Sequence, residues 1–303
     1  MHPEPQDGSD AVILLVNPAA GRGRAHDAGD AVRRELDGAG FVVEQIAGID
    51  TEDARRRMRD ALMRAPRPVV VVGGDGTLSG ILAEVLDADV PIALVPAGTG
   101  NDLARALGLS ADPAEAVLAL RTAQTRRIDV AEIHGAERRM PFLTVAAFGF
   151  DARVSERTNT LRWPRGAARY YVALLRELIS LRPLAFRASL DDATPVGQPG
   201  TLLAVANTAS YGGGMRIHPG ALPDDGLLDV VHVVPLTRRR LLRLFPLLLQ
   251  GRHLDRAEVT ARQAASVHVE GAGVVAYVDG ERVGEGPFRV TIRPGALAMI
   301  VPG

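Results

Sequence analysis

A glycine-rich segment at residues 73–77, Gly-Gly-Asp-Gly-Thr, has the composition of a phosphate-binding loop. It lets a ligand reach the backbone N–H groups, and a helix beginning at Thr77 would present its positive end to an anion. The carboxylate of Asp75 would repel a polyphosphate unless a cation lay between them, so the segment predicts a nucleotide held with Mg²⁺. The alternative is an ordinary strand-to-helix turn in which glycine serves geometry alone.

Two other turns carry similar residues. Asn17-Pro-Ala-Ala-Gly21 follows an apolar run at 11–16, and a turn containing Gly-Thr-Gly-Asn-Asp at 98–102 follows one at 91–95. Neither turn has the third glycine of a dinucleotide-binding loop, so a Rossmann cofactor is not expected. The polar residues of the second turn could instead only cap the helix that follows.

The elements that must position these turns alternate between strands and helices over the first 130 residues. This alternation predicts a parallel sheet with helices on both faces, and four valines at 69–72 form its buried central strand. Ligands of such sheets bind at the carboxyl ends of the strands, where all three turns lie. The expected strands are 11–16, 41–46, 68–72 and 91–95, and the expected helices are 25–39, 51–65, 77–86 and one beginning at Leu103.

The pattern changes after Asp129, where short apolar runs separated by turn residues predict an antiparallel β sandwich or barrel. The expected strands are 142–147, 185–190, 202–206, 228–234, 266–269, 274–278, 288–292 and 298–301, and the expected helices are 165–181 and 238–249. We therefore expect a disordered polar tail at 1–10, a nucleotide-binding α/β domain at 11–131, a β-rich domain at 132–295 and a C-terminal strand at 296–303.

Composition excludes several kinds of chemistry. The 303 residues contain no cysteine, which excludes disulfides and thiolate chemistry, and all 35 basic residues are arginine, which excludes a Walker A lysine and a Schiff base. The formal net charge of -1 gives no reason to expect a nucleic-acid partner. No apolar run is long enough to cross a membrane, and a cytoplasmic protein is expected.

Two basic amphipathic segments interrupt the second half. Residues 153–187 carry eight arginines against two glutamates, with Trp163, Tyr170 and Tyr171 among them, and residues 238–256 carry six arginines against one aspartate. Such segments could contact anionic lipid headgroups at a membrane surface. The alternative is two surface helices with arginine toward water and leucine in the core.

Taken together, five motifs resemble those of the bacterial diacylglycerol kinase-like lipid kinases, relatives of sphingosine and ceramide kinases. They are Asn17-Pro-Ala-Ala-Gly21, Gly73-Gly-Asp-Gly-Thr77, Gly98-Thr-Gly-Asn-Asp-Leu-Ala-Arg105, Asp225-Gly-Leu227 and Asp279-Gly-Glu281. By themselves the last two are turn signals, and Asp279-Gly280 is typical of a hairpin. The resemblance implies a phosphofructokinase- or NAD kinase-like first domain, a β-rich second domain, and a last strand that returns to the first.

The resemblance also implies roles for particular residues. The ATP site would comprise Asn17, Pro18, Ala19, Ala20, Gly21, Thr51, Gly73, Gly74, Asp75, Gly76, Thr77, Thr99, Asn101 and Asp102. A catalytic Mg²⁺ would be supported by Asp75, Asp102 and Asp129, and a second, structural Mg²⁺ by the Asp225 carboxylate with the carbonyls of Leu222 and Leu227. Asp279 would be the general base, with Glu281 beside it.

The implied function is an ATP- and Mg²⁺-dependent lipid kinase in phospholipid biosynthesis, with diacylglycerol as the expected acceptor and phosphatidic acid as the product. Other acceptors of the same fold remain open (a sphingoid base, ceramide, phosphatidylglycerol or NAD), as do a non-catalytic lipid- or nucleotide-binding regulator and a homodimer. The basic segments would bring the enzyme to the inner face of the membrane. One departure is Ser79-Gly80, where the family commonly has Asn-Glu; Glu84 could replace the missing carboxylate.

Overall fold

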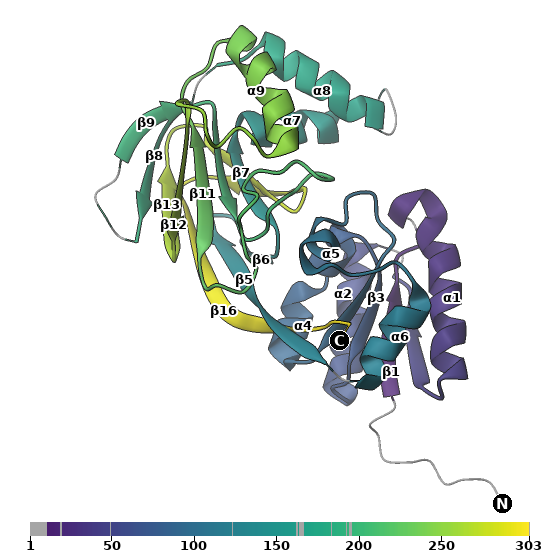
Figure 1. Ribbon diagram of the computed structural model, residues 1–303. Coiled ribbons are helices and arrows are strands. Elements are labelled where there is room, and N and C mark those ends of the chain that lie inside the picture. Colours follow the sequence, from purple (N-terminus) through teal and green to yellow (C-terminus); the bar gives the residue numbers. More distant parts are fainter. Residues whose placement is uncertain are drawn as a thin grey trace, which may run out of the picture. The chain divides into compact units, whose positions relative to one another are not determined.

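The computed structural model describes residues 11–18, 20–48, 50–122, 124–161, 163, 167–182, 184–191, 193 and 196–302. The expected tail at 1–10 and the predicted site residue Ala19 lie outside these residues. The chain divides into two compact units (Figure 1). The first comprises Met1–Ile128 with Gly295–Gly303, and the second comprises Asp129–Pro294.

The first unit is built on a parallel sheet with the order β2-β1-β3-β4. Its strands are β1 (Ala11–Val16), β2 (Val42–Ile46), β3 (Val69–Gly73) and β4 (Ile92–Pro96). The last strand of the chain, β16 (Phe288–Ile300), adds to its edge, where Met299 pairs with Ile92 in parallel. All four valines at 69–72 are fully buried, as a central strand covered on both faces requires.

Helices connect these strands. They are η2 (Ala20–Gly23), α1 (Arg24–Gly38), α2 (Thr51–Arg64), α3 (Asp75–Ser79), α4 (Leu82–Ala88), α5 (Asp102–Leu107) and α6 (Pro113–Thr122). Apolar side chains of α1 and α6 share one core with β1, β3 and β4. The helix expected at 77–86 begins earlier, at Asp75, and is two helices. Glycine at position 80 is a poor helix former, and the backbone of Ile81 leaves the helical conformation, so the chain turns there before α4.

The second unit has antiparallel strands in two sheets. One sheet has the order β12-β11-β10-β7-β14-β15, and in the other β16, β13, β8 and β9 are neighbours, with β5 paired to β16 and to β6. The bounds are β5 (Thr125–His134), β6 (Arg139–Phe142), β7 (Val145–Gly149), β8 (Leu184–Leu190), β9 (Val196–Gly200), β10 (Leu202–Ala206), β11 (Leu228–Val233), β12 (Val259–Ala264), β13 (Ser266–Glu270), β14 (Val275–Val278) and β15 (Glu281–Glu285). The predicted α/β unit and β sandwich are therefore confirmed.

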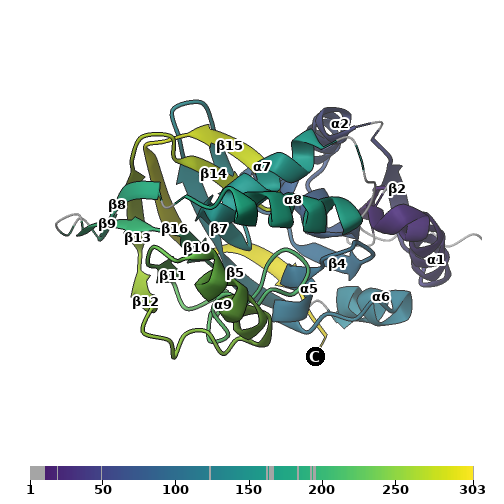
Figure 2. The ribbon, with the colours of Figure 1, turned by 90° about the horizontal axis from the view of Figure 1, so that it is seen from above.

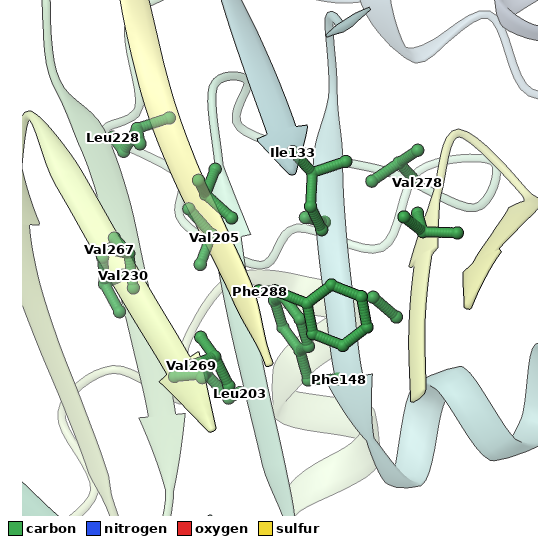
Figure 3. Close-up of a cluster of buried hydrophobic side chains, with 14 of the residues drawn as sticks. Ile133, Phe148, Leu203, Val205, Leu228, Val230, Val267, Val269, Val278 and Phe288 are labelled. Atoms are coloured by element: carbon green, nitrogen blue, oxygen red, sulfur yellow. The ribbon is translucent and has the colours of Figure 1, made fainter. Parts of the chain in front are cut away.

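One core fills the space between these sheets (Figure 3). It contains Phe148 and Phe288, whose ring centroids are 5.6 Å apart, with Val205, Val267 and other apolar side chains around them. Three helices complete the unit: α7 (Phe150–Thr160), α8 (Ala167–Ile179) and α9 (Arg238–Gln250). Helices α7 and α8 lie side by side (Figure 2).

The sequence patterns missed helices α6 and α7 and strands β5, β9 and β12, and they joined or split three others. The single strand expected at 142–147 is interrupted at Leu143 and Thr144, where the Leu143 N–H donates to the Asp279 carboxylate instead of to a neighbouring strand. The strands expected at 288–292 and 298–301 are one strand, β16, which begins in the second unit and ends in the first.

Candidate active site

The first and second predicted loops are joined by side-chain and backbone hydrogen bonds at the carboxyl end of the parallel sheet. Asn17, directly after β1, donates from Nδ2 to the Thr77 hydroxyl at 3.2 Å, and its backbone N–H donates to the Val72 carbonyl at 3.3 Å. Ala20 in turn donates to the Asn17 carbonyl at 3.0 Å. The first and second glycine loops are therefore parts of one arrangement.

The second and third loops touch backbone to backbone. A Cβ added at Gly98 would lie 2.4 Å from the Gly74 Cα, and one added at Gly74 would lie 2.9 Å from the Gly98 Cα. Ala97 donates to the Gly73 carbonyl at 2.9 Å. Glycine is required at both positions because any side chain would force the loops apart.

Arg24, the first residue of α1, contacts two of these loops, and the sequence analysis missed it. Its Nε donates to the Gly21 carbonyl and its Nη2 donates to the Gly98 carbonyl, both at 3.0 Å. A signal was available in the sequence, because an arginine in the first turn of a helix is unfavourable beside the positive end of the helix dipole. Such a charge must serve another purpose, and here it ties the first loop to the third.

Asp75 caps a helix that begins 27 residues later. Its two carboxylate oxygens accept hydrogen bonds from the backbone N–H groups of Asp102 and Leu103, at 2.9 and 3.0 Å, which are at the start of α5. Burial raises the pKa of Asp75, although these hydrogen bonds oppose the rise. The carboxylate predicted to face a nucleotide therefore also fixes the third loop.

The other polar residues of the third loop are also engaged. The Asn101 side chain folds back on Gly98, accepting from its N–H at 3.0 Å and donating to its carbonyl at 3.2 Å, and its backbone adopts the left-handed conformation with φ 54°. The buried carboxylate of Asp102 accepts from Arg105 Nη1 at 2.6 Å. Asn101 therefore shapes the loop and does not cap α5 with its side chain.

A cavity of about 270 Å³ opens beside these loops, within the first unit. It gathers four predicted site residues, Asn17, Thr51, Gly76 and Thr77, whereas Thr99 is exposed and does not line it. Gly80 also forms its wall, and a Cβ there would lie 3.1 Å from Thr51 Cγ2. The glycine that replaces the family's glutamate thus leaves this cavity open.

Glu84, suggested as a substitute for that glutamate, does not line the cavity. It is buried against α2, where its Oε1 accepts from Arg55 Nε at 3.2 Å and from Arg59 Nη2 at 2.9 Å. Two arginines hold this carboxylate between α4 and α2. The suggestion is therefore not supported by the structure.

Asp279 lies in the second unit, at the turn between β14 and β15. The predicted hairpin is confirmed, with Val278 paired to Glu281, and Asp279 has a left-handed backbone with φ 47°. Its carboxylate accepts hydrogen bonds from the Leu143 N–H at 3.4 Å and from the Thr144 hydroxyl. Glu281 is half exposed, with Arg138 Nη2 at 3.7 Å.

Asp129 belongs to the same unit and is fully buried. Its Oδ2 accepts from the Gly226 N–H and its own N–H donates to the Pro223 carbonyl, both at 2.7 Å. It thereby holds the turn that carries Asp225, whose Oδ1 accepts from the Leu227 N–H at 3.0 Å. Within the part of the chain that the structure describes, no three acidic or histidine side chains are grouped to hold a metal ion.

A buried carboxyl in the second unit was missed by sequence reasoning. Asp151, in the first turn of α7, accepts a hydrogen bond from the Tyr211 hydroxyl. Burial raises its pKa to about 6. The residue is the second after strand β7, and the sequence contains no signal that separates it from an exposed helix residue.

The first basic segment exposes apolar as well as charged side chains. On α8, Leu175 and Ile179 lie one turn apart and are 57% and 59% exposed. A polar hollow between α7 and α8 is lined by three arginines and two glutamates: Arg153, Arg157, Arg182, Glu156 and Glu177. The side chains of Tyr170 and Tyr171 lie outside the described residues, and none of the described helices is long and apolar enough to cross a membrane.

A parallel sheet with glycine loops at one edge, combined with an antiparallel sandwich, defines the NAD kinase-like class of fold. The solved structure of an NAD kinase from Archaeoglobus fulgidus in complex with ATP shares it, with a TM-score of 0.54, 14% identity and coverage of 96% and 94% of the two chains. A diacylglycerol kinase structure from Bacillus anthracis has a TM-score of 0.71, 21% identity and coverage of 96% and 97%.

Sequence comparisons identify the family. Residues 11–133 match the diacylglycerol kinase catalytic domain, and residues 144–301 match the YegS C-terminal NAD kinase beta sandwich-like domain. A diacylglycerol kinase of Mycobacterium tuberculosis is 40% identical over 96% of this chain and 95% of its own length. A probable lipid kinase YegS-like of Pseudomonas aeruginosa is 33% identical over 97% and 95%. The chain belongs to the diacylglycerol kinase-like family of lipid kinases.

Proposed function

We propose that this protein transfers the γ-phosphate of ATP, bound with Mg²⁺, to the hydroxyl of diacylglycerol and so forms phosphatidic acid. The observation that carries the proposal is the joining of three glycine loops to one another, with Asn17 bound to Thr77 and Gly74 against Gly98, beside a cavity that the first two loops line. We choose diacylglycerol as the acceptor because the Mycobacterium tuberculosis relative, which is similar over almost its whole length, is named a diacylglycerol kinase.

The first unit supplies the nucleotide site. The cavity walled by Asn17, Thr51 and Thr77 takes part of the nucleotide, and the glycine loops present backbone N–H groups to its phosphates. Arg24, held between two of the loops, keeps them at a fixed separation and adds positive charge. Phosphoryl transfer depends mainly on positioning and charge neutralisation, so this chain needs no lysine for it.

Carboxylates suit the Mg²⁺ that accompanies ATP, and the residues proposed to support it are Asp75, Asp102 and Asp129. Each oxygen of Asp75 accepts one backbone N–H and retains a further lone pair, so a direct or water-bridged contact to the cation remains available. The cation would neutralise the charge that develops on the phosphates. A second cation is proposed at the Asp225 carboxylate with the Leu222 and Leu227 carbonyls.

Asp279 is the proposed general base. As the lipid oxygen bonds to the γ-phosphorus and the bond to ADP breaks, the hydroxyl proton passes to the Asp279 carboxylate. Leu143 and Thr144 hold that carboxylate by hydrogen bonds, which fixes its orientation. Glu281, at the start of β15, stands beside it.

We further propose that the enzyme reaches its lipid by peripheral contact with the inner face of the membrane, through residues 153–187 and 238–256. Leu175 and Ile179 on α8 would enter the interface, with the arginines of the α7–α8 hollow at the headgroups.

The test is transfer of labelled γ-phosphate to mixed micelles of diacylglycerol, ceramide, sphingosine or phosphatidylglycerol, with NAD as a soluble control. We expect labelled phosphatidic acid from wild type, at least about a hundredfold less from Asp279→Asn, and ATP binding within twofold of wild type in that variant. Asp60→Asn, the same change on the exposed face of α2, should be as active as wild type. Label on another lipid would change the proposed acceptor. If neither wild type nor Asp279→Asn transfers label to any acceptor, the non-catalytic alternative is favoured.

A further inference from the structure

A buried amide joins the segment that holds Asp279 to the strand that carries Asp129. Asn207, directly after β10, is fully buried, and its Nδ2 donates to the carbonyls of Asp129 and Leu143, both at 3.1 Å. Its backbone N–H donates to the Thr144 carbonyl at 2.8 Å. One residue therefore makes three hydrogen bonds to two separate parts of the second unit.

The pairing of the strands explains why these hydrogen bonds concern Asp279. Strand β7 lies between β10 and β14 in its sheet. The last residue of β10 pairs with the first residue of β7, and the last residue of β14 pairs with the second. Asn207 and Asp279, which follow these two strands, therefore flank residues 143–144 from opposite sides. Leu143 accepts from Asn207 with its carbonyl and donates its own N–H to Asp279.

Only one orientation of the Asn207 amide fits these contacts. The nitrogen of an amide carries two N–H donors and the oxygen can only accept, so the reversed orientation would put an oxygen against two carbonyl oxygens. In the observed orientation both N–H groups are used, and Oδ1 has no donor within the part of the chain that the structure describes. A buried acceptor without a donor opposes folding, so packing alone would favour an apolar side chain here. The two N–H groups are therefore the feature that distinguishes this side chain.

We infer that Asn207 is a positioning residue for phosphoryl transfer, because it fixes residues 143–144 and through them the orientation of the Asp279 carboxylate. The inference rests on the proposed function, in which Asp279 is the general base, and it adds a buried residue that acts through that base. The same amide ties the segment to Asp129, which is proposed to support the catalytic cation. A displacement of about 1 Å can cost about a hundredfold in rate, because the base must lie within hydrogen-bond distance of the lipid hydroxyl.

The experiment compares two substitutions that keep the branching of the side chain and remove its donors. Asn207→Leu removes both amide N–H groups, and the control Thr208→Val removes a hydroxyl that donates to the Ser210 carbonyl at 3.0 Å. Both positions are fully buried, but the Thr208 hydroxyl bonds within its own loop. Phosphate transfer from ATP to diacylglycerol in micelles is measured with the full chain, below the unfolding temperature of each variant.

We expect Asn207→Leu to lower kcat at least tenfold, with the KM values for ATP and diacylglycerol within twofold of wild type. Thr208→Val should stay within twofold of wild type in kcat and in both KM values. If leucine prevents folding, Asn207→Ala is measured in its place, with the same expected loss, because it also removes both donors and adds no bulk.

A double-mutant cycle separates positioning of the base from general damage. In the Asp279→Asn background no base remains to be positioned, so adding Asn207→Leu should slow the residual transfer less than twofold. A structural defect would instead lower the rate by the same factor in both backgrounds.

Four outcomes would overturn the inference. If Asn207→Leu keeps the kcat of wild type, the segment needs no amide, and the proposed function stands without this addition. If the losses of the two single variants multiply in the double variant, Asn207 does not act through Asp279. If Thr208→Val loses as much kcat as Asn207→Leu, disturbed packing explains both losses. If wild type transfers no phosphate, or Asp279→Asn transfers it as fast as wild type, the proposed function or its base is wrong and the inference fails with it.

Discussion

The contact between the second and third glycine loops allows one prediction to be worked through. In Gly98→Ala, the new methyl carbon would lie 2.4 Å from the Gly74 Cα, where ordinary contacts are 3.4–4 Å. It would also lie 2.7 Å from Asn101 Oδ1, which accepts the Gly98 N–H. Both neighbours are held in place, one by backbone and one by its hydrogen bonds, so the loops must move apart by about 1 Å.

The expected magnitude follows from the cost of overpacking. Forcing one methyl group into a packed site costs about 1–3 kcal/mol, and each kcal/mol lowers the unfolding temperature of a domain of this size by about 2–4 °C. We therefore expect Gly98→Ala to unfold about 2–12 °C below wild type. Because Arg24 and Asp75 tie the same loops, the displacement should spread through the site and weaken ATP binding at least tenfold.

The control is Gly76→Ala, the same substitution at another glycine of the second loop. A Cβ at Gly76 meets nothing within 4 Å, and alanine favours the helix α3 in which it lies. Its unfolding temperature should equal or exceed that of wild type in calorimetry. If the two variants unfold at the same temperature, the loops do not pack backbone to backbone and the reasoning is wrong.

Three further predictions concern other parts of the chain. Burial raises the pKa of Asp151 from 3.8 to about 6. The stability linked to its protonated form is therefore present below about pH 4 and is lost as pH rises through 6. In urea unfolding, the free energy of unfolding of Asp151→Asn should rise relative to that of wild type by up to about 3 kcal/mol between pH 4 and pH 8. Gly80→Glu should fill the cavity beside Thr51 and weaken ATP binding at least tenfold in calorimetric titration. Leu175→Asp should lower binding to phosphatidylglycerol vesicles about tenfold in flotation assays, whereas the equally exposed control Leu118→Asp on α6 should not.

Each of these has a result that contradicts it. A constant difference between Asp151→Asn and wild type across the pH range would mean that the carboxyl does not titrate there. Tighter ATP binding by Gly80→Glu would show that the family's glutamate contacts the nucleotide and that its loss weakens this enzyme. Equal loss of vesicle binding in both leucine variants would remove α8 from the membrane contact.

Much of the architecture could be predicted because it depends on local patterns. Four successive valines are suited to a strand with both faces covered, and all four are fully buried. Asp-Gly between apolar runs tolerates the left-handed backbone of a tight hairpin, and Asp279 and Gly280 adopt it. The missed elements have weaker local signals: β12 is exposed along most of its length, and β5 has arginine as its second and third residues.

The sequence by itself determined the alternation of strands and helices, the position of the glycine turns and the absence of lysine and cysteine chemistry. These follow from dihedral preferences, hydrophobic periodicity and composition, which act over a few residues. The tertiary structure alone decided that Asp75 caps α5, that Arg24 links two loops and that Asn207 joins Leu143 to Asp129. Such contacts join residues tens of positions apart, and they depend on the order in which the sheets bring their strands together.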